Sequence, residues 1–258
     1  ADAERWLGLD IFGPNKKRLR IEFDSQSSDF GSICYRLDSA SVSANFAATS
    51  DAIAHETGHA IIHKLKPGWK AGAALIMHEA VADIMVVLSQ LSNPAIVRNI
   101  LASQGGLDIE NKASRIVELP DGTALRSALA PTTLMDVPFQ RDTLHLPEIA
   151  FRGSRNDPHR ASVVITAAIY DFVRFRSHHL TGSGPSRPEV IQQIADEAGR
   201  MVLAAALISE EHQVTIESYM MSLLLIAKNH LGTEARDGLA ELLVGRGLIS
   251  SQSQVRPE

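Results

Sequence analysis

The chain has 258 residues, of which 45% are hydrophobic and 21% are charged, so it can bury a full core as one large domain or two small ones. Its formal net charge is −5 and its basic residues are scattered, which argues against a nucleic-acid partner. Uninterrupted apolar runs are under ten residues long, which favours core helices and no membrane partner.

The N-terminal part, to about residue 50, contains short elements of both kinds. We expect a helix around residues 3–8 and a strand over residues 18–23, followed by a serine-rich polar run. The first ten residues lack the basic and apolar regions of a signal peptide, which leaves the compartment open. Cys34 is the single cysteine, so any metal site within this chain must use His, Asp or Glu.

Helical periodicity dominates from Asp51 onward. The apolar spacing predicts helices over residues 51–65, 75–91, 95–103, 161–180, 189–207, 215–231 and 235–247. Residues 121–158 are rich in proline, glycine and polar side chains, which predicts a long ordered loop region that holds binding groups. The sequence therefore predicts an α+β fold that is predominantly α, with an N-terminal α+β part over residues 1–72 and a mainly helical part over residues 73–258.

The first of these helices carries a metal-binding motif. His55-Glu56-Thr57-Gly58-His59 fits the pattern H-E-x-x-H, in which two histidines one turn apart face a single zinc ion and the glutamate reaches its bound water. His63 extends the row, but three such imidazoles span about 12 Å and cannot share one ion. Glu79, 20 residues after His59 on the next predicted helix, is the best third ligand if the two helices form a hairpin.

With Asp83 one turn after Glu79, these residues resemble the thermolysin-like family of gluzincin metallopeptidases, which carry N-E-x-x-x-D where this chain has H-E-A-V-A-D. The resemblance implies a thermolysin-like zincin fold, with the active-site helix between the two parts. It implies one zinc ion bound by His55, His59 and Glu79. It also implies that Asp83 supports the far nitrogen of His55, and that His78 replaces the family's asparagine.

Further segments extend the resemblance over about residues 51–249. "ALRSALAP" is similar to a family segment whose arginine binds a substrate carbonyl, which implies that role for Arg126. "DPHRASVV" is similar to one whose histidine donates to the oxyanion of the tetrahedral intermediate, which implies that role for His159, with Ser162 as the matching serine. Glu56 is then the catalytic base and later the acid.

The chain also departs from the family. The tyrosine that assists the oxyanion histidine falls near Trp69 and Lys70, where there is no hydroxyl. Of the carboxylates that bind paired calcium ions, Asp51 alone has a match, so we expect no double calcium site. The substrate-pairing edge strand is assigned to residues 30–36. Five other histidines are expected to be ordinary core or surface groups: His63, His78, His145, His178 and His179.

The sequence thus predicts a zinc metallopeptidase, an endopeptidase acting on peptides or proteins. Two alternatives stay open: a zinc-binding but inactive interaction domain of the same fold, and a zinc hydrolase acting on a non-peptide amide. The resemblance favours a secreted protein, and the sequence leaves the oligomeric state and the side-chain specificity open.

Overall fold

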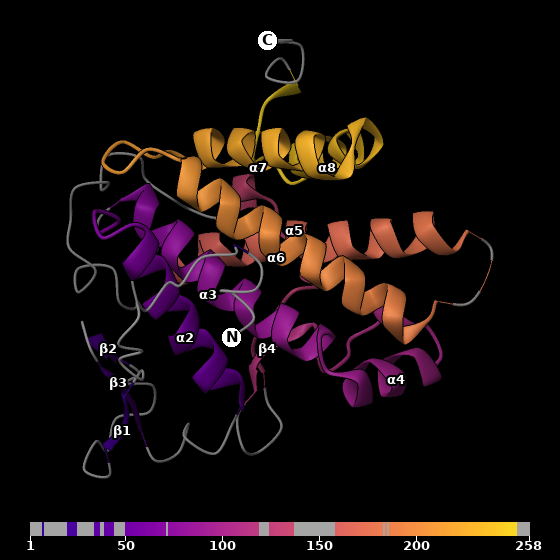
Figure 1. Ribbon diagram of the computed structural model, residues 1–258, viewed down its shortest axis with the longest axis horizontal. Coiled ribbons are helices and arrows are strands. Elements are labelled where there is room, and N and C mark those ends of the chain that lie inside the picture. The colour runs from indigo at the N-terminus through magenta and orange to yellow at the C-terminus, as the bar shows by residue number, and fades with distance from the viewer. Residues whose placement is uncertain are drawn as a thin grey trace.

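The computed structural model describes residues 50–70, 72–118, 124–136, 158–182, 184 and 186–251, together with Leu7 and three N-terminal strands. The described chain is α+β and predominantly helical, as the sequence predicts (Figure 1). The expected helix around residues 3–8, apart from Leu7, lies outside the described residues, and so does His145.

Seven α-helices follow the strands in the described part of the chain. Their bounds differ from the predicted ranges by at most three residues at either end, so the helical predictions are confirmed. They are α2 (Ser50–Leu65), α3 (Ala73–Leu91), α4 (Pro94–Ala102), α5 (Pro158–Thr181), α6 (Pro188–Ile208), α7 (Ile216–Leu231) and α8 (Thr233–Gly245). The division into parts at residues 72 and 73 stays a prediction.

The N-terminal strands form a three-stranded sheet of order β1-β3-β2, which lies beside α2 in Figure 1. The predicted strand over residues 18–23 is confirmed as β1 (Arg20–Asp24), which pairs in parallel with β3 (Ser39–Ser43). β2 (Cys34–Arg36) pairs antiparallel with β3 and lies at an edge of the sheet. The segment assigned to the substrate-pairing strand therefore includes an edge strand.

The region predicted to be a loop over residues 121–158 is partly a strand, which corrects that prediction. β5 (Ala124–Ser127) pairs antiparallel with β4 (Arg115–Glu118), and this hairpin packs through β4 on α2 and α3. Strands of four residues carry too little alternation to be recognised in a sequence. Two single turns of 3-10 helix, η1 (Gly106–Asp108) and η2 (Leu134–Asp136), flank the hairpin along the chain.

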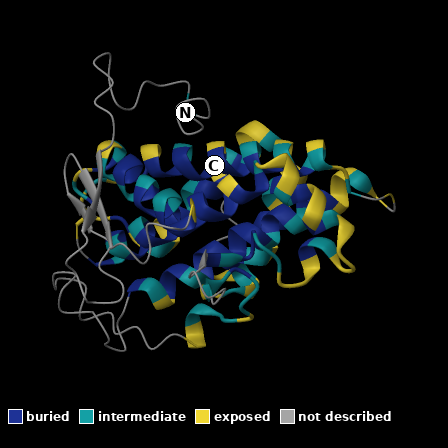
Figure 2. Ribbon diagram, turned by 90° about the horizontal axis from the view of Figure 1, so that it is seen from below, coloured by how far each residue is buried: buried dark blue, intermediate teal, exposed yellow. Residues whose placement is uncertain are grey.

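Helix α3 is the centre of the core and contacts α2, α4, α5 and α6. By length and composition it is apolar enough to cross a membrane, which the count of uninterrupted apolar residues did not reveal. However, 83% of its apolar window is buried inside the protein, and Figure 2 shows the buried residues gathered where the helices pack together. Burial of this kind is typical of the core helix of a globular domain.

A tight turn and a close helix contact set α2 against α3. Gly72, at the start of α3, has φ 61°, a left-handed conformation that glycine adopts without strain. Within the H-E-x-x-H motif, a Cβ atom on Gly58 would lie 2.6 Å from the Cα atom of Ala82. The absence of a side chain at Gly58 therefore lets the two helix backbones come together, and the predicted helical hairpin is confirmed.

Candidate metal centre

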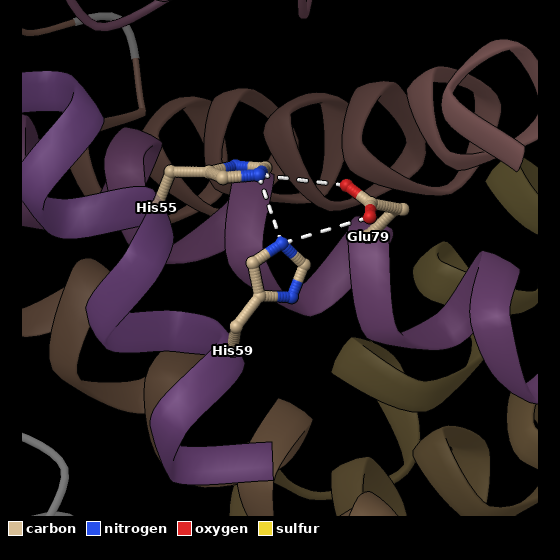
Figure 3. Close-up of side chains that lie close together, drawn as sticks. All are labelled: His55, His59 and Glu79. Carbon is tan, nitrogen blue, oxygen red and sulfur yellow. Dashed lines mark hydrogen bonds and ion pairs between the residues drawn. The ribbon is translucent and has the colours of Figure 1, made fainter. Parts of the chain in front are cut away.

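Two imidazoles from α2 and one carboxylate from α3 converge at the hairpin (Figure 3). The Nε2 atoms of His55 and His59 lie 3.0 Å apart. Glu79 places Oε2 at 3.4 Å from His55 Nε2 and Oε1 at 3.6 Å from His59 Nε2. His55 and Glu79 are buried, and the side chain of His59 is 12% exposed. The structure thus brings together the three residues that the sequence singles out as metal ligands.

The donor atoms are suited to holding a metal ion. Bonds of about 2.0–2.1 Å in a tetrahedral zinc site place the ligand atoms about 3.3 Å apart, close to the three separations observed here. Glu79 Oε2 is buried, and its contacts with neighbouring imidazoles lack the alignment of a hydrogen bond. An oxygen atom in that position has a lone pair to offer to a cation. His55, His59 and Glu79 can therefore hold a metal ion.

His55 is supported from its far side by Asp83. Its Nδ1 atom lies 3.0 Å from Asp83 Oδ1, on the fully buried side chain one helical turn after Glu79. Arg126, on β5, donates from Nη2 to the same carboxylate oxygen at 2.6 Å. The hydroxyl of Ser162, on α5, lies 3.4 Å from Asp83 Oδ2. Residues of two elements, β5 and α5, thus contact the carboxylate that faces His55.

His59 is supported by a residue that the sequence analysis treated as an ordinary histidine. His59 Nδ1 lies 2.7 Å from Nδ1 of His78, and the two rings are stacked with an interplanar angle of 25°. His78 immediately precedes Glu79 on α3. His78 therefore contacts one of the three candidate ligands, and its expected role as an ordinary hydrogen-bonded histidine stays a prediction. The feature of the sequence that could have indicated this contact is that His78 stands where the thermolysin-like family has an asparagine.

His159 lies at the mouth of the centre, in the first turn of α5. Its Nε2 atom is 3.1 Å from Glu79 Oε2, and its side chain is 36% exposed. The hydroxyl of Ser162 donates to the backbone carbonyl of His159 at 3.0 Å, which ties this turn to the Asp83 side of the site. Glu56 follows His55 on α2 and is buried. All the residues with assigned catalytic or binding roles thus lie on elements that surround one centre.

The side chains of the candidate centre hold opposite charges. Although burial of His55 opposes its protonation, the contacts with Asp83 and Glu79 raise the pKa of His55 to about 9. Burial lowers the pKa of His59 well below its ordinary value and that of His78 to about 4. Burial opposes ionisation of Glu79, but the neighbouring imidazoles hold its pKa well below the usual range. The imidazole of His55 thus favours its protonated form, and the carboxyl group of Glu79 its ionised form.

Asp51, the one match to the family's calcium ligands, has protein cations and donors for partners. Its fully buried carboxylate accepts a hydrogen bond from Lys112 Nζ at 2.8 Å and another from Gln90 Nε2. Lys112 follows η1 and is 61 residues away in the sequence. The ammonium group of Lys112 therefore supplies positive charge beside Asp51.

Of the two residues at the position expected for the family's tyrosine, Trp69 is buried and Lys70 is exposed. Trp69 is buried, and its Nε1 atom donates to the backbone carbonyl of Glu210 at 3.0 Å. Lys66, in the same connection between α2 and α3, donates to the carbonyl of Ser209. These two hydrogen bonds attach the connection between α2 and α3 to the segment after α6. The side chain of Trp69 is part of the hydrophobic core.

His63, His178 and His179 lie on the two helices that carry His55, His59 and His159. His63 is half-buried on α2, where burial and the nearby cations Lys70 and Lys64 lower its pKa. At the end of α5, Nε2 of His178 lies 3.6 Å from a carboxylate oxygen of Asp108, and Nε2 of His179 lies 3.1 Å from one of Glu234.

Comparison with protein-family models and with curated proteins found no match to this chain.

Proposed function

We propose that this protein is a zinc-dependent metallopeptidase, an endopeptidase that hydrolyses peptide bonds in peptides or proteins. The observation that carries the proposal is the convergence of His55, His59 and Glu79, with the buried Glu56 next to His55 in the sequence. Two imidazoles and one carboxylate that leave a tetrahedral position free are the ligand set of catalytic zinc sites. When bound, a zinc ion supplies Lewis acidity, which lowers the pKa of its water to about 7 and polarises a carbonyl oxygen.

Glu56 has the role of proton carrier in this proposal. It lies next to His55 on the helix that provides two of the ligands, and it is buried with them. A carboxylate so placed accepts the proton from the attacking water and returns it to the leaving amine. Because Glu56 is only one residue after His55, its side chain projects from a different face of α2 than the two histidine ligands.

His159 and Arg126 have substrate-facing roles in the proposal. The partial exposure of His159, beside Glu79 at the mouth of the centre, is consistent with donation to the oxyanion of the transition state. Arg126 is 14% exposed and already holds Asp83, so one guanidinium can orient the support of His55 and bind a substrate carbonyl with another N–H group.

We further propose that the fold is a thermolysin-like zincin. This is supported by the position of α2, which contacts the sheet through β2 and β3 on one side and α3 on the other. It is also supported by the order of the site segments along the chain, with α2 and α3 before β5 and α5. In this arrangement β2, as an edge strand, has backbone groups to offer to an extended peptide.

The test combines metal analysis with digestion of casein and a peptide library. We expect one zinc ion per chain, chelator-sensitive cleavage, and loss of at least 10²-fold in kcat for Glu56→Gln, the range of a lost acid–base group. Glu56→Gln must retain its zinc ion to serve as the control. Wild-type protein that binds zinc but cleaves no more than this variant would rule out the peptidase; activity on a non-peptide amide would then identify another hydrolase, and its absence an interaction domain.

A further inference from the structure

The second zinc-motif histidine has a support of a different chemical kind from the first. His55 Nδ1 faces the carboxylate of Asp83, which is fixed by Arg126. His59 Nδ1 faces another imidazole, that of His78, at 2.7 Å. We propose that His78 is a positioning residue that holds His59, through an Nδ1-to-Nδ1 hydrogen bond, with Nε2 directed at the metal. This inference rests on the metal site of the proposed function.

The geometry fixes the direction of this hydrogen bond. His59 Nε2 faces the other donor atoms, at 3.0 Å from His55 Nε2 and 3.6 Å from Glu79 Oε1, so this nitrogen is the ligand atom. A neutral imidazole that binds a metal through Nε2 carries its proton on Nδ1. His59 Nδ1 is therefore the donor, and His78 Nδ1 must be the acceptor.

The acceptor role determines the tautomer of His78. A neutral imidazole has one donor and one acceptor nitrogen, so a lone pair on Nδ1 requires the proton of His78 to be on Nε2. The zinc-loaded protein should then contain two different tautomers in contact, Nδ1–H on His59 and Nε2–H on His78. A side chain that merely fills space beside His59 would have no such requirement.

The position of His78 on α3 makes this support rigid. It directly precedes Glu79 on a helix that is buried over most of its length. Asp83, which supports His55, lies on the same helix. A single core helix thus supplies the third ligand and a support for each of the other two. Loss of an outer support of this kind costs about 10- to 100-fold in metal affinity.

Two substitutions separate the hydrogen bond from the packing. His78→Phe keeps a ring to stack on His59 but has no acceptor, whereas His78→Asn loses the ring but places a carbonyl oxygen near the position of Nδ1. His178→Phe is the matched control, because its imidazole is 67% exposed at the far end of α5. Zinc affinity is measured by competition with a chromophoric chelator, with circular dichroism to verify that each variant is folded.

We expect His78→Phe to raise the Kd for zinc about 10- to 100-fold, and His78→Asn and the control to stay within about threefold of wild type. The opposite order, with His78→Phe binding zinc tightly and His78→Asn weakly, would mean that ring packing, and not the hydrogen bond, supports His59. That result would overturn this inference and leave the proposed function standing. Wild-type protein that binds no zinc would overturn the proposed function as well.

A spectroscopic measurement tests the same inference without a substitution. Proton–nitrogen correlation spectra of the imidazoles in zinc-loaded wild-type protein report which ring nitrogen carries the proton. We expect Nε2–H for His78 and Nδ1–H for His59. A proton on Nδ1 of His78 would overturn the inference, because that nitrogen would then be unable to accept.

Discussion

His55 Nε2 and His59 Nε2 lie 3.0 Å apart, although the backbones of the two residues are one helical turn apart on α2. Two imidazole nitrogens at this distance both face Glu79, from the neighbouring helix. Although burial of His55 opposes its protonation, Asp83 and Glu79 raise its pKa to about 9, whereas burial lowers the pKa of His59 well below its ordinary value. We expect a metal ion bound by these atoms to displace the proton of His55.

Glu79→Gln should weaken zinc binding by more than the 10- to 100-fold typical of changes outside the ligand shell, because a neutral amide replaces a charged ligand. The measurement is the zinc content after dialysis, together with the Kd from chelator competition. Glu110→Gln is the control, since that side chain is 64% exposed. Equal zinc affinity in wild type and Glu79→Gln would show that Glu79 is not a ligand.

The apparent affinity for zinc should rise with pH. The pKa of His55 is raised to about 9 in the metal-free protein, so binding at neutral pH displaces one proton. Below pH 9 the protonated form dominates, and the apparent association constant should increase about tenfold per pH unit between pH 7 and pH 8.5. Titrations at several pH values test this. A constant affinity over that range would contradict it.

Asp83→Asn should change both the strength and the pH dependence of zinc binding. An amide cannot neutralise the His55 imidazolium, so the pKa of His55 should fall and less proton should be displaced. We expect a 10- to 100-fold weaker affinity at pH 8.5 and a flatter pH profile between pH 7 and pH 8.5. If the profile keeps the wild-type slope, Asp83 is not what raises the pKa of His55.

Gly58→Ala should destabilise the fold. The added Cβ atom would lie 2.6 Å from the Cα atom of Ala82, and backbone at that position cannot rotate away. Overpacking of this kind costs about 1–3 kcal/mol in the free energy of unfolding. Gly245→Ala is the matched control, because a Cβ atom there meets no other atom within 4 Å. Urea denaturation compares the two, and equal stability would mean that α2 and α3 can separate freely.

Lys112→Met should lower stability in a way that calcium does not restore. The substitution removes the ammonium group from the fully buried carboxylate of Asp51, and loss of such a partner costs about 1–3 kcal/mol. Lys228→Met, on the exposed face of α7, is the control. Thermal unfolding of wild type should be the same with and without millimolar calcium. A calcium-dependent rise in Tm would contradict the expectation that the protein has no double calcium site.

Local features of the sequence were enough to predict the helices. Apolar residues recur at helical spacing in each of them, and Asn93 followed by Pro94 marks the start of α4, where the asparagine side chain accepts from Ala95 and Ile96. The H-E-x-x-H motif is equally local, since His55 and His59 share a face of any helix that contains them. The spacing to Glu79 needed the additional assumption of a helical hairpin.

Contacts between distant segments were decided by the tertiary structure. The β4–β5 hairpin places Arg126 on Asp83, 43 residues away, and the loop after η1 places Lys112 on Asp51. His78 meets His59 because Gly58 lets α2 approach α3 closely. A helix depends on residues that are close together in the sequence, so both the helix and a motif within it can be predicted locally. Which side chains support that motif depends on how the helices and strands pack, and packing brings together residues that are far apart in the sequence.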